Sequence, residues 1–351
     1  MEKSQRLIDS ANKSFGEIIR DGFRLFSKNY VNLIIPLAFF QIILIILDIF
    51  ALTDLRWYAD SLSVDVAEIM EKLLDNITLT ESEFNSFIKF FMLTLAIGFI
   101  QNLIGAIIIT IAMCSVSNYL YNRYMQNETN IGDSFKSAFN KKIFLVIFLI
   151  GICLPISFYM LFIPAIIIFG FFIFLVFTYN INDVEKPISE ARRIAKGNFW
   201  KILITFILNF IIIFIIKSIY LSIFDLFLNP SSDLYKSWLS PDTRNYVMII
   251  LYQILRNLID ILLAPLFICL LTSLFASSKA KKDLGYESQG RYQSEGTIFI
   301  PSPRTSSMGV PEKQSDNQNV EKFYCPFCGY EINIPKKFCP NCGQSFTFIN
   351  E

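Results

Sequence analysis

The chain has 351 residues, of which 53% are hydrophobic and only 17% charged, and its formal net charge is +1. A soluble domain of this size does not need so many apolar runs long enough to span a membrane, so this composition predicts a polytopic membrane protein. The near-zero net charge gives no indication of a nucleic-acid partner. The sequence contains no histidine, which excludes Ser–His and Cys–His catalysis, histidine metal ligands and histidine-based pH sensing.

The N-terminal part predicts an amphipathic helix followed by a membrane span. The helix is expected at residues 14–26, where Ser14 and Glu17 have the spacing of a capping box. The first span is expected at about residues 31–52, because about 20 largely apolar residues cross a bilayer as a helix. A polar, acidic segment follows it, and the second span is expected at about residues 87–113.

The same order of elements recurs in the middle of the chain. A second amphipathic helix is expected at residues 130–140, and the charge-free stretch after it is long enough for two spans. We therefore predict a hairpin of two spans, at about residues 143–160 and 163–181, with Pro155 and Pro164 on either side of its turn.

The third repeat of this order begins at Pro187, which suits the first position of a helix because its missing N–H would have no partner there. The basic side chains on the polar face of this helix are Arg192, Arg193 and Lys196. A basic face opposite an apolar face is typical of a helix in the lipid headgroup region, and an ordinary cytosolic connector helix is the alternative. Two further spans are expected, at about residues 201–224 and 246–276.

The distribution of lysine and arginine predicts the orientation. Residues 1–30, 114–142 and 182–201 carry six, four and five of these residues, whereas the three intervening loops carry two, none and two. Under the positive-inside rule, this pattern predicts six spans in the cell membrane with both termini in the cytoplasm. All three amphipathic helices then lie on the cytoplasmic face of the domain formed by residues 1–276.

The C-terminal tail is expected to consist of a flexible cytoplasmic linker at residues 277–322 and a zinc ribbon at residues 323–351. The linker contains many Ser, Gln, Gly and Pro residues and few apolar ones. The ribbon contains two Cys-Pro-x-Cys-Gly motifs, and each tight turn presents two thiolates to one ion. The four expected ligands are Cys325, Cys328, Cys339 and Cys342.

Four thiolates in tetrahedral geometry select zinc, with iron as the alternative metal. Redox dithiols and two disulfides are the other interpretations of the same cysteines. A cytoplasmic tail disfavours disulfides, and two matched doublets are not typical of a lone redox motif. Four protein ligands leave no open coordination position, so the predicted zinc is structural. The segment resembles the short zinc ribbons at the ends of many prokaryotic, especially archaeal, proteins.

Polar side chains interrupt three of the predicted spans at a similar depth. Counted from the cytoplasmic ends at ~1.5 Å per residue, Asp48, Lys217 and Asp260 lie at about 24–26 Å in a hydrocarbon layer of about 30 Å. On the last span, Arg256 and Asp260 have the i,i+4 spacing of an ion pair. The members of this cluster are Asp48, Lys217, Gln253, Arg256, Asn257 and Asp260.

Two hypotheses remain open for this cluster. It forms either the floor of an outward-open polar pocket in the membrane, or a structural set of ion pairs and side chains that reach the outer headgroups. The first hypothesis favours a transporter, and the second favours a structural role.

The membrane part resembles a known group of multi-pass proteins. The residues that carry the resemblance are Lys28-Asn29-Tyr30 and Gly197-Asn198-Phe199-Trp200, each just before a span, together with Pro187 and Ala191. Residues 15–276 are similar to proteins grouped with the membrane domain of glycerophosphodiester phosphodiesterases, and to several families of six-span envelope proteins. The resemblance implies a membrane domain with no assigned chemistry, because no stretch outside the spans could hold the phosphodiesterase's catalytic barrel.

The sequence therefore predicts an all-α, six-span integral membrane protein with a small C-terminal zinc ribbon. The first functional hypothesis is a non-enzymatic scaffold or organiser in the lipid bilayer, whose ribbon binds a cytoplasmic protein partner. The alternative is a transporter or channel for a small solute or lipid. A membrane-embedded enzyme is the weakest hypothesis, because the sequence contains no evident nucleophile–base pair and no convergent carboxylates.

Overall fold

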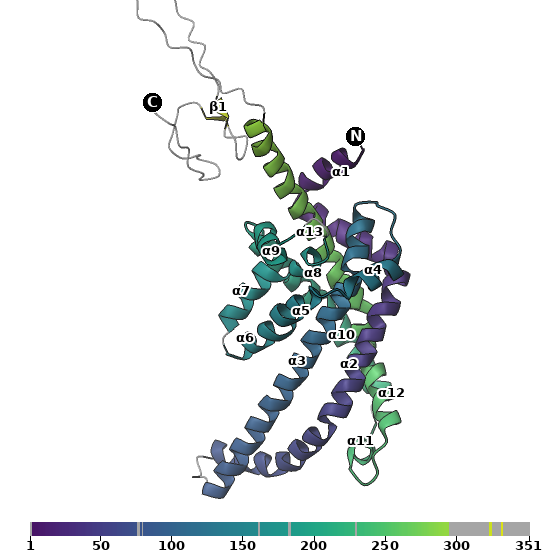
Figure 1. Cartoon of the computed structure of the whole chain (residues 1–351). Coiled ribbons are helices and arrows are strands. Elements are labelled where there is room, and N and C mark those ends of the chain that lie inside the picture. Colours follow the sequence, from purple (N-terminus) through teal and green to yellow (C-terminus); the bar gives the residue numbers. More distant parts are fainter. Residues whose placement is uncertain are drawn as a thin grey trace, which may run out of the picture. The chain divides into compact units, whose positions relative to one another are not determined.

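A computed structural model of the chain describes residues 2–75, 78, 80–160, 162–181, 184–228, 230–294, 323–324 and 331–332. The chain divides into two units, Met1–Lys282 and Asp283–Glu351, and the first unit is a bundle of helices (Figure 1). Five helices in the described part are long and apolar enough to cross a membrane. The architecture is thus that of an all-α, multi-pass membrane protein.

The first long helices form a pair joined by a short loop. After α1 (Glu2–Ala11) come α2 (Phe15–Leu74) and α3 (Glu81–Tyr124). The capping box predicted before α2 is present, because the Ser14 N–H donates to Glu17 Oε2 at 2.8 Å and the Glu17 N–H donates to Ser14 Oγ at 3.4 Å. A second capping box opens α3. Local sequence therefore sets where both helices start.

The predicted amphipathic helix at 14–26 and the predicted span at 31–52 are not separate elements. Both belong to α2, which also continues through the acidic segment as far as Leu74. The residues between them, Lys28-Asn29-Tyr30, include neither glycine nor proline, and nothing there ends the helix. Pro36 lies inside α2, and such prolines are tolerated in membrane helices.

A helical hairpin follows the short helix α4 (Ile131–Ala138). Its first arm consists of α5 (Ile143–Val146), a π-helix, η1 (Ile147–Cys153), and α6 (Leu154–Met160). Pro155 has no N–H and its ring crowds the carbonyl one turn earlier, which accounts for the wider turns just before it.

The second arm of the hairpin consists of α7 (Phe162–Phe172) and α8 (Leu175–Thr178). It is apolar but shorter than the five long helices. The span predicted at 163–181 is therefore interrupted and ends early. Between α9 (Pro187–Ala195) and the long helix α10 (Phe199–Leu228), Gly197 adopts a φ of 86°, which permits the sharp turn.

The span predicted at 246–276 is not one helix. After α11 (Ser232–Leu239), α12 (Tyr246–Arg256) ends at Asn257, and α13 (Leu258–Ser294) begins directly after it. The Asn257 N–H and Nδ2 both donate to the Gln253 carbonyl, at 3.0 and 2.8 Å, so the side chain competes with the helical backbone. Because α13 continues beyond residue 276, the first part of the segment predicted as a flexible linker is helical.

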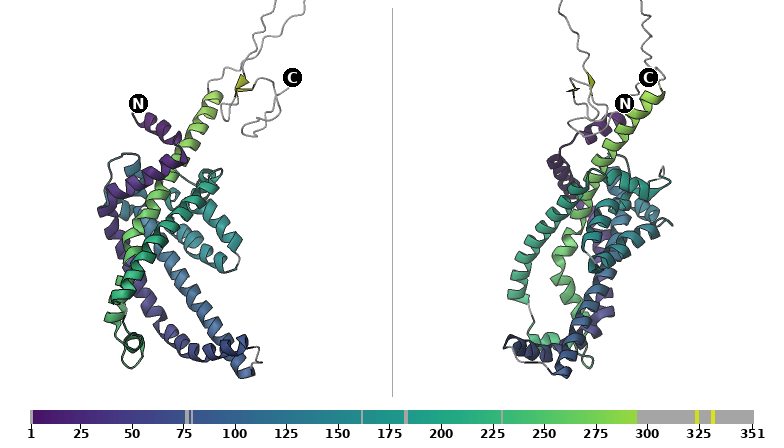
Figure 2. Two further views of the ribbon diagram at one scale, coloured as in Figure 1. Left: turned by 180° about the vertical axis from the view of Figure 1, so that it is seen from behind. Right: turned by 90° about the vertical axis from the view of Figure 1, so that its left-hand side faces the viewer.

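The central helix of the first unit is α13. Within its most apolar window 61% of the residues are buried, against 17–28% for the other four long helices. In the right-hand view of Figure 2, α13 lies between α10 and the α2–α3 pair. The largest buried side chains, Tyr119, Tyr179 and Phe275, gather where α3 ends, and the Tyr179 hydroxyl lies 3.2 Å from the carbonyl oxygens of both Cys114 and Ala138.

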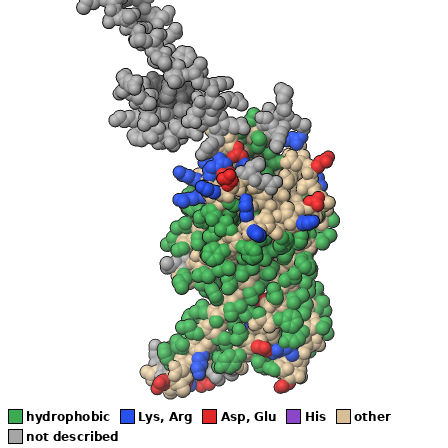
Figure 3. Space-filling model, viewed as in Figure 1, with side chains coloured by type: hydrophobic (Ala, Val, Ile, Leu, Met, Phe, Trp, Pro, Cys, Tyr) green, Lys and Arg blue, Asp and Glu red, His purple; other side chains and the backbone are tan. Residues whose placement is uncertain are grey.

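The amphipathic helix α9 packs on protein rather than on lipid. Its apolar side chains Ala191, Ile194 and Ala195 are fully buried, and the helix contacts α7 and α8. The interpretation that its apolar face enters the lipid headgroup region is therefore wrong. On the face that Figure 3 draws, apolar side chains form a broad band across the unit, and most of the lysine and arginine side chains lie beyond one edge of that band.

In the second unit, β1 (Phe323–Tyr324) pairs antiparallel with β2 (Glu331–Ile332). In this pair Phe323 lies opposite Ile332, and Tyr324 lies opposite Glu331. The predicted zinc ligands Cys325, Cys328, Cys339 and Cys342 lie outside the described residues.

Candidate functional site

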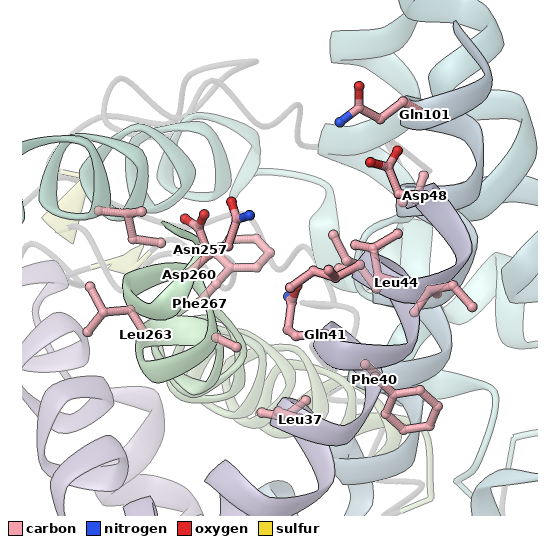
Figure 4. Close-up of a pocket in the computed structure, with 18 of the residues that line it drawn as sticks. Leu37, Phe40, Gln41, Leu44, Asp48, Gln101, Asn257, Asp260, Leu263 and Phe267 are labelled. Atoms are coloured by element: carbon pink, nitrogen blue, oxygen red, sulfur yellow. The ribbon is translucent and has the colours of Figure 1, made fainter. Parts of the chain in front are cut away.

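A pocket of about 900 Å³ lies between α2, α3, α10 and the α12–α13 segment (Figure 4). Four members of the predicted polar cluster line it: Asp48, Gln253, Asn257 and Asp260. Gln41 extends from α2 toward α13, on the other side of the pocket from Asn257 and Asp260. The tertiary structure therefore brings most of the predicted cluster to one cavity.

The two predicted carboxylates of this pocket are each paired with a cation. Arg56 Nη2 donates to both carboxylate oxygens of Asp48, at 3.0 and 2.8 Å. Lys217 Nζ donates to Asp260 Oδ2 at 2.5 Å, which ties α10 to α13. The pairing removes most of the cost of placing these charges near the hydrocarbon layer, and it leaves the two pairs with no net charge.

Arg256 does not take part in the pocket, and the predicted pair between Arg256 and Asp260 does not form. Arg256 Nη1 instead donates to the Tyr252 hydroxyl at 3.2 Å, and its guanidinium lies 5.9 Å from the centre of that ring. The break at Asn257 interrupts the regular i,i+4 geometry between α12 and α13. The carboxylate of Asp260 pairs instead with Lys217 of α10.

The break between α12 and α13 lines the pocket. Irregular backbone within a membrane is tolerated where it lines a cavity or where other groups satisfy the freed polar atoms. Here the Tyr220 hydroxyl of α10 donates to the Leu255 carbonyl at 2.6 Å. Gln253, in the last turn of α12, lies 3.4 Å from the Tyr235 hydroxyl of α11. The broken helix thus presents Gln253 and Asn257 to the cavity, while the carbonyls of Gln253 and Leu255 accept hydrogen bonds.

The cluster predicted from the sequence did not include several polar residues that line the pocket. They are Gln41, Arg56, Gln101, Asn102, Asn209 and Tyr235. Gln41, Gln101, Asn102 and Asn209 are amides inside predicted spans, and that signal alone could have drawn attention to them. Arg56 and Tyr235 lie in the predicted outer segments, where polar residues are ordinary, and only the folded chain places them at the pocket.

Asn209 is the deepest polar group of the pocket. Its side chain is 7% exposed, and its Oδ1 is buried without a hydrogen-bond partner in the described part of the chain. It follows Lys201 by eight residues, a rise of ~12 Å along α10. A buried amide oxygen without a partner is costly, so this position calls for a donor from water or from a bound molecule.

The inner end of the pocket is otherwise apolar. The apolar side chains at this end come from the halves of the helices that lie nearer to the basic end of the unit. They are Leu37, Phe40, Ala112, Met113, Phe206, Phe267 and Ile268. Asp48, Arg56, Gln253 and Asp260 gather at the opposite end. The pocket is therefore amphipathic along the helix axes, with a charge-paired polar end and a largely apolar end that contains the amides of Asn209 and Gln41.

The described residues contain no group of three or more Cys, Asp or Glu side chains placed to hold a metal ion. The two cysteine motifs of the tail lie outside those residues. No protein-family model, no curated protein and no solved structure matches the chain. The resemblance to the membrane domain of glycerophosphodiester phosphodiesterases stays a prediction.

Proposed function

We propose that the first unit is a six-span membrane domain that takes an amphiphilic, lipid-like molecule into the pocket between α2, α3, α10 and α13, as a transporter does. The observation that carries this proposal is the gradient along the cavity, from paired charges and amides to aliphatic and aromatic side chains. Its volume of about 900 Å³ lies within the usual range for ligand pockets.

The lining favours an amphiphile over a small polar solute. A fully polar solute would contact Phe40, Met113 and Phe267 at the inner end of the pocket. Its polar groups would find few hydrogen-bond partners there, which is unfavourable. An apolar chain buries that surface, while its polar head meets the amides near Asn257. Because Asp48 and Asp260 are already paired, a head without large net charge fits best.

The orientation belongs to the same proposal. Six spans with both termini in the cytoplasm put the basic end of the unit inside and the polar end of the pocket outside. The pocket then receives its ligand from the outer leaflet or the outer solution. Asp260, which pairs with Lys217, and the helix break at Asn257 line the polar end of the pocket, where a change of conformation would alter access.

The test is binding of a fluorescent single-chain phospholipid, lysophosphatidylcholine, to the purified full chain in detergent. Ala264→Trp fills the pocket from α13 and is expected to weaken binding about tenfold or more, because the apolar chain loses its volume. Ile211→Trp is the matched control, since Ile211 is 46% exposed on α10 and does not line the pocket. Equal binding by both variants and the unchanged protein would contradict the proposal.

A second function is favoured by the tail. We propose that Cys325, Cys328, Cys339 and Cys342 hold one structural zinc, and that the resulting ribbon binds a cytoplasmic protein as a scaffold does. The donor set of four thiolates suits zinc. The antiparallel pair β1–β2 brackets the first cysteine motif in sequence, and it sets Tyr324, just before that motif, opposite Glu331. We do not propose an enzymatic activity.

The zinc site has a direct test in elemental analysis of the full chain, purified under reducing, zinc-replete conditions. One zinc per chain is expected, and Cys339→Ser with Cys342→Ser should remove it, because two thiolates do not complete a tetrahedral site. Cys114→Ser with Cys153→Ser is the control with the same number of changed cysteines, both in membrane helices. Absence of zinc from the unchanged protein would disprove this assignment.

A further inference from the structure

A second polar cavity lies at the other end of the α2–α3 pair, where α3 ends. Two adjoining hollows of about 520 and 210 Å³ share Leu25, Lys28, Arg123 and Gln126 in their walls, and together they form one basic hollow. The basic hollow is lined by the start of α2, the last turn of α3 and the loop after α3. It shares no lining residue with the amphipathic pocket.

The basic hollow carries an excess of positive charge. Its cations are Lys13, Arg24, Lys28 and Arg123, and its anions are Asp21 and Glu128. Lys13 pairs with Asp21 at 2.7 Å. Arg24, Lys28 and Arg123 form no ion pair with any residue that the structure describes, and their side chains are exposed. Four cations and two anions leave a net charge of +2 at this place.

Arg123 is positioned by an aromatic ring rather than by a carboxylate. Its guanidinium lies 5.5 Å from the centre of the Tyr119 ring. That ring is 1% exposed, and its hydroxyl is fixed between two α2 side chains, because Asn32 Nδ2 donates to it at 3.1 Å and it donates to Asn29 Oδ1 at 3.2 Å. The guanidinium is thus held in place while its N–H donors stay available to an anion.

The loop after α3 completes the wall of the basic hollow. Gln126 has a φ of 57°, a left-handed conformation that residues other than glycine rarely adopt. In this turn the Gln126 N–H donates to the Arg123 carbonyl at 3.1 Å, and the Asn127 N–H donates to the Asn122 carbonyl at 2.9 Å. These bonds occupy carbonyls at the negative end of α3, which would otherwise oppose an anion.

The basic hollow lies at the level of lipid headgroups. Lys28 precedes the apolar run of α2 by three residues, and Arg123 follows the apolar run of α3. Phosphates of anionic lipids lie at this level of a bilayer, and basic pockets between membrane helices bind them. The walls suit one phosphate, with arginine as a forked donor and lysine as a point charge.

We propose that the basic hollow of Lys28, Arg123 and Arg24 binds the phosphate of an anionic phospholipid in the leaflet where α2 enters and α3 leaves the membrane. The proposal does not depend on the amphipathic pocket, which lies toward the other end of the same helices. The chain would then have a binding site for an anionic phospholipid in one leaflet, separate from the ligand site in the amphipathic pocket.

The test uses the full chain in nanodiscs of phosphatidylcholine with increasing fractions of phosphatidylglycerol, and counts the retained phosphatidylglycerol by native mass spectrometry. Lys28→Gln with Arg123→Gln is expected to weaken retention about tenfold or more, because charge-assisted hydrogen bonds are lost. The matched control is Arg192→Gln with Lys196→Gln, which removes two charges from exposed positions at α9 and should leave retention nearly unchanged.

Equal losses in both double variants would show only general attraction to a basic surface and would overturn the proposal. Inorganic phosphate at the concentration of the lipid is expected not to displace it. Displacement would assign the hollow to a soluble phosphate and overturn the lipid assignment. If the double variant does not fold, the exposed single change Lys28→Gln serves the same test, and retention equal to that of the unchanged protein would also count against the site.

Discussion

At the residue scale, the ion pair between Lys217 and Asp260 separates the two hypotheses for the polar cluster. Asp260→Asn leaves the lysine without its counter-charge near the hydrocarbon layer and is expected to lower the free energy of unfolding by about 1–2 kcal/mol, less than for a fully buried pair. Adding Lys217→Met should recover part of this loss. Thermal unfolding in detergent measures both changes.

Binding of the lysophosphatidylcholine probe decides what the pair is for. In the pocket hypothesis, the double variant is stable but binds the probe more weakly, because the polar end of the pocket has lost the charges of Asp260 and its partner Lys217. Unchanged binding by a stable double variant would make the pair purely structural. Stability losses that simply add in the double variant would show that Lys217 and Asp260 do not interact.

Gln126 provides a second prediction at this scale. Its positive φ strains any side chain with a Cβ, so Gln126→Gly is expected to be about 1 kcal/mol more stable than Gln126→Ala. Both changes remove the same polar group, and their difference therefore isolates the backbone strain. Equal melting temperatures of the two variants would argue against the left-handed turn.

At the scale of elements, the contact between α2 and α13 depends on Gly22. A Cβ at this position would lie 2.9 Å from the Cα of Leu270 and 2.8 Å from one of its methyl groups, so the backbone of α13 would have to move. Gly22→Ala is expected to destabilise the protein by about 1–3 kcal/mol through overpacking. The measurement is thermal unfolding followed by tryptophan fluorescence.

Gly16→Ala is the control for this contact, because Gly16 lies in the same helix and a Cβ added there would have nothing within 4 Å. There the higher helix propensity of alanine should stabilise α2 by about 0.5–1 kcal/mol. Destabilisation of similar size at both positions would mean that α2 does not pack closely on α13.

At the scale of the whole molecule, the proposed orientation predicts which loops are accessible from outside. Single cysteines at positions 236 and 192, in place of exposed Lys236 and Arg192, are introduced into a chain without native cysteines. A membrane-impermeant maleimide added to intact cells should label position 236 and not position 192, because the positive-inside rule places α9 in the cytoplasm. If only position 192 is labelled, the orientation in the membrane is the opposite of the one proposed.

The sequence by itself determined the features that depend on neighbouring residues. The apolar runs predicted a membrane protein, and the Ser14–Glu17 pair marked the start of α2, because capping bonds join residues three apart. Asp48 and Asp260 could be predicted from depth alone to reach the same region of the membrane, since helical rise converts position in the sequence to position across the bilayer, and both line the pocket.

Only the tertiary structure decided which partners those side chains have. Asp260 pairs with Lys217 rather than with Arg256, because α10 lies beside the break after α12 and a nearby cation from another helix replaces a pair within one helix. The burial of Asn209 Oδ1 without a described hydrogen-bond partner and the basic hollow around Arg123 also depend on packing between distant segments. Such contacts leave no periodic signal in the sequence, because the helices that supply them are separated by many residues and are brought together only by the fold.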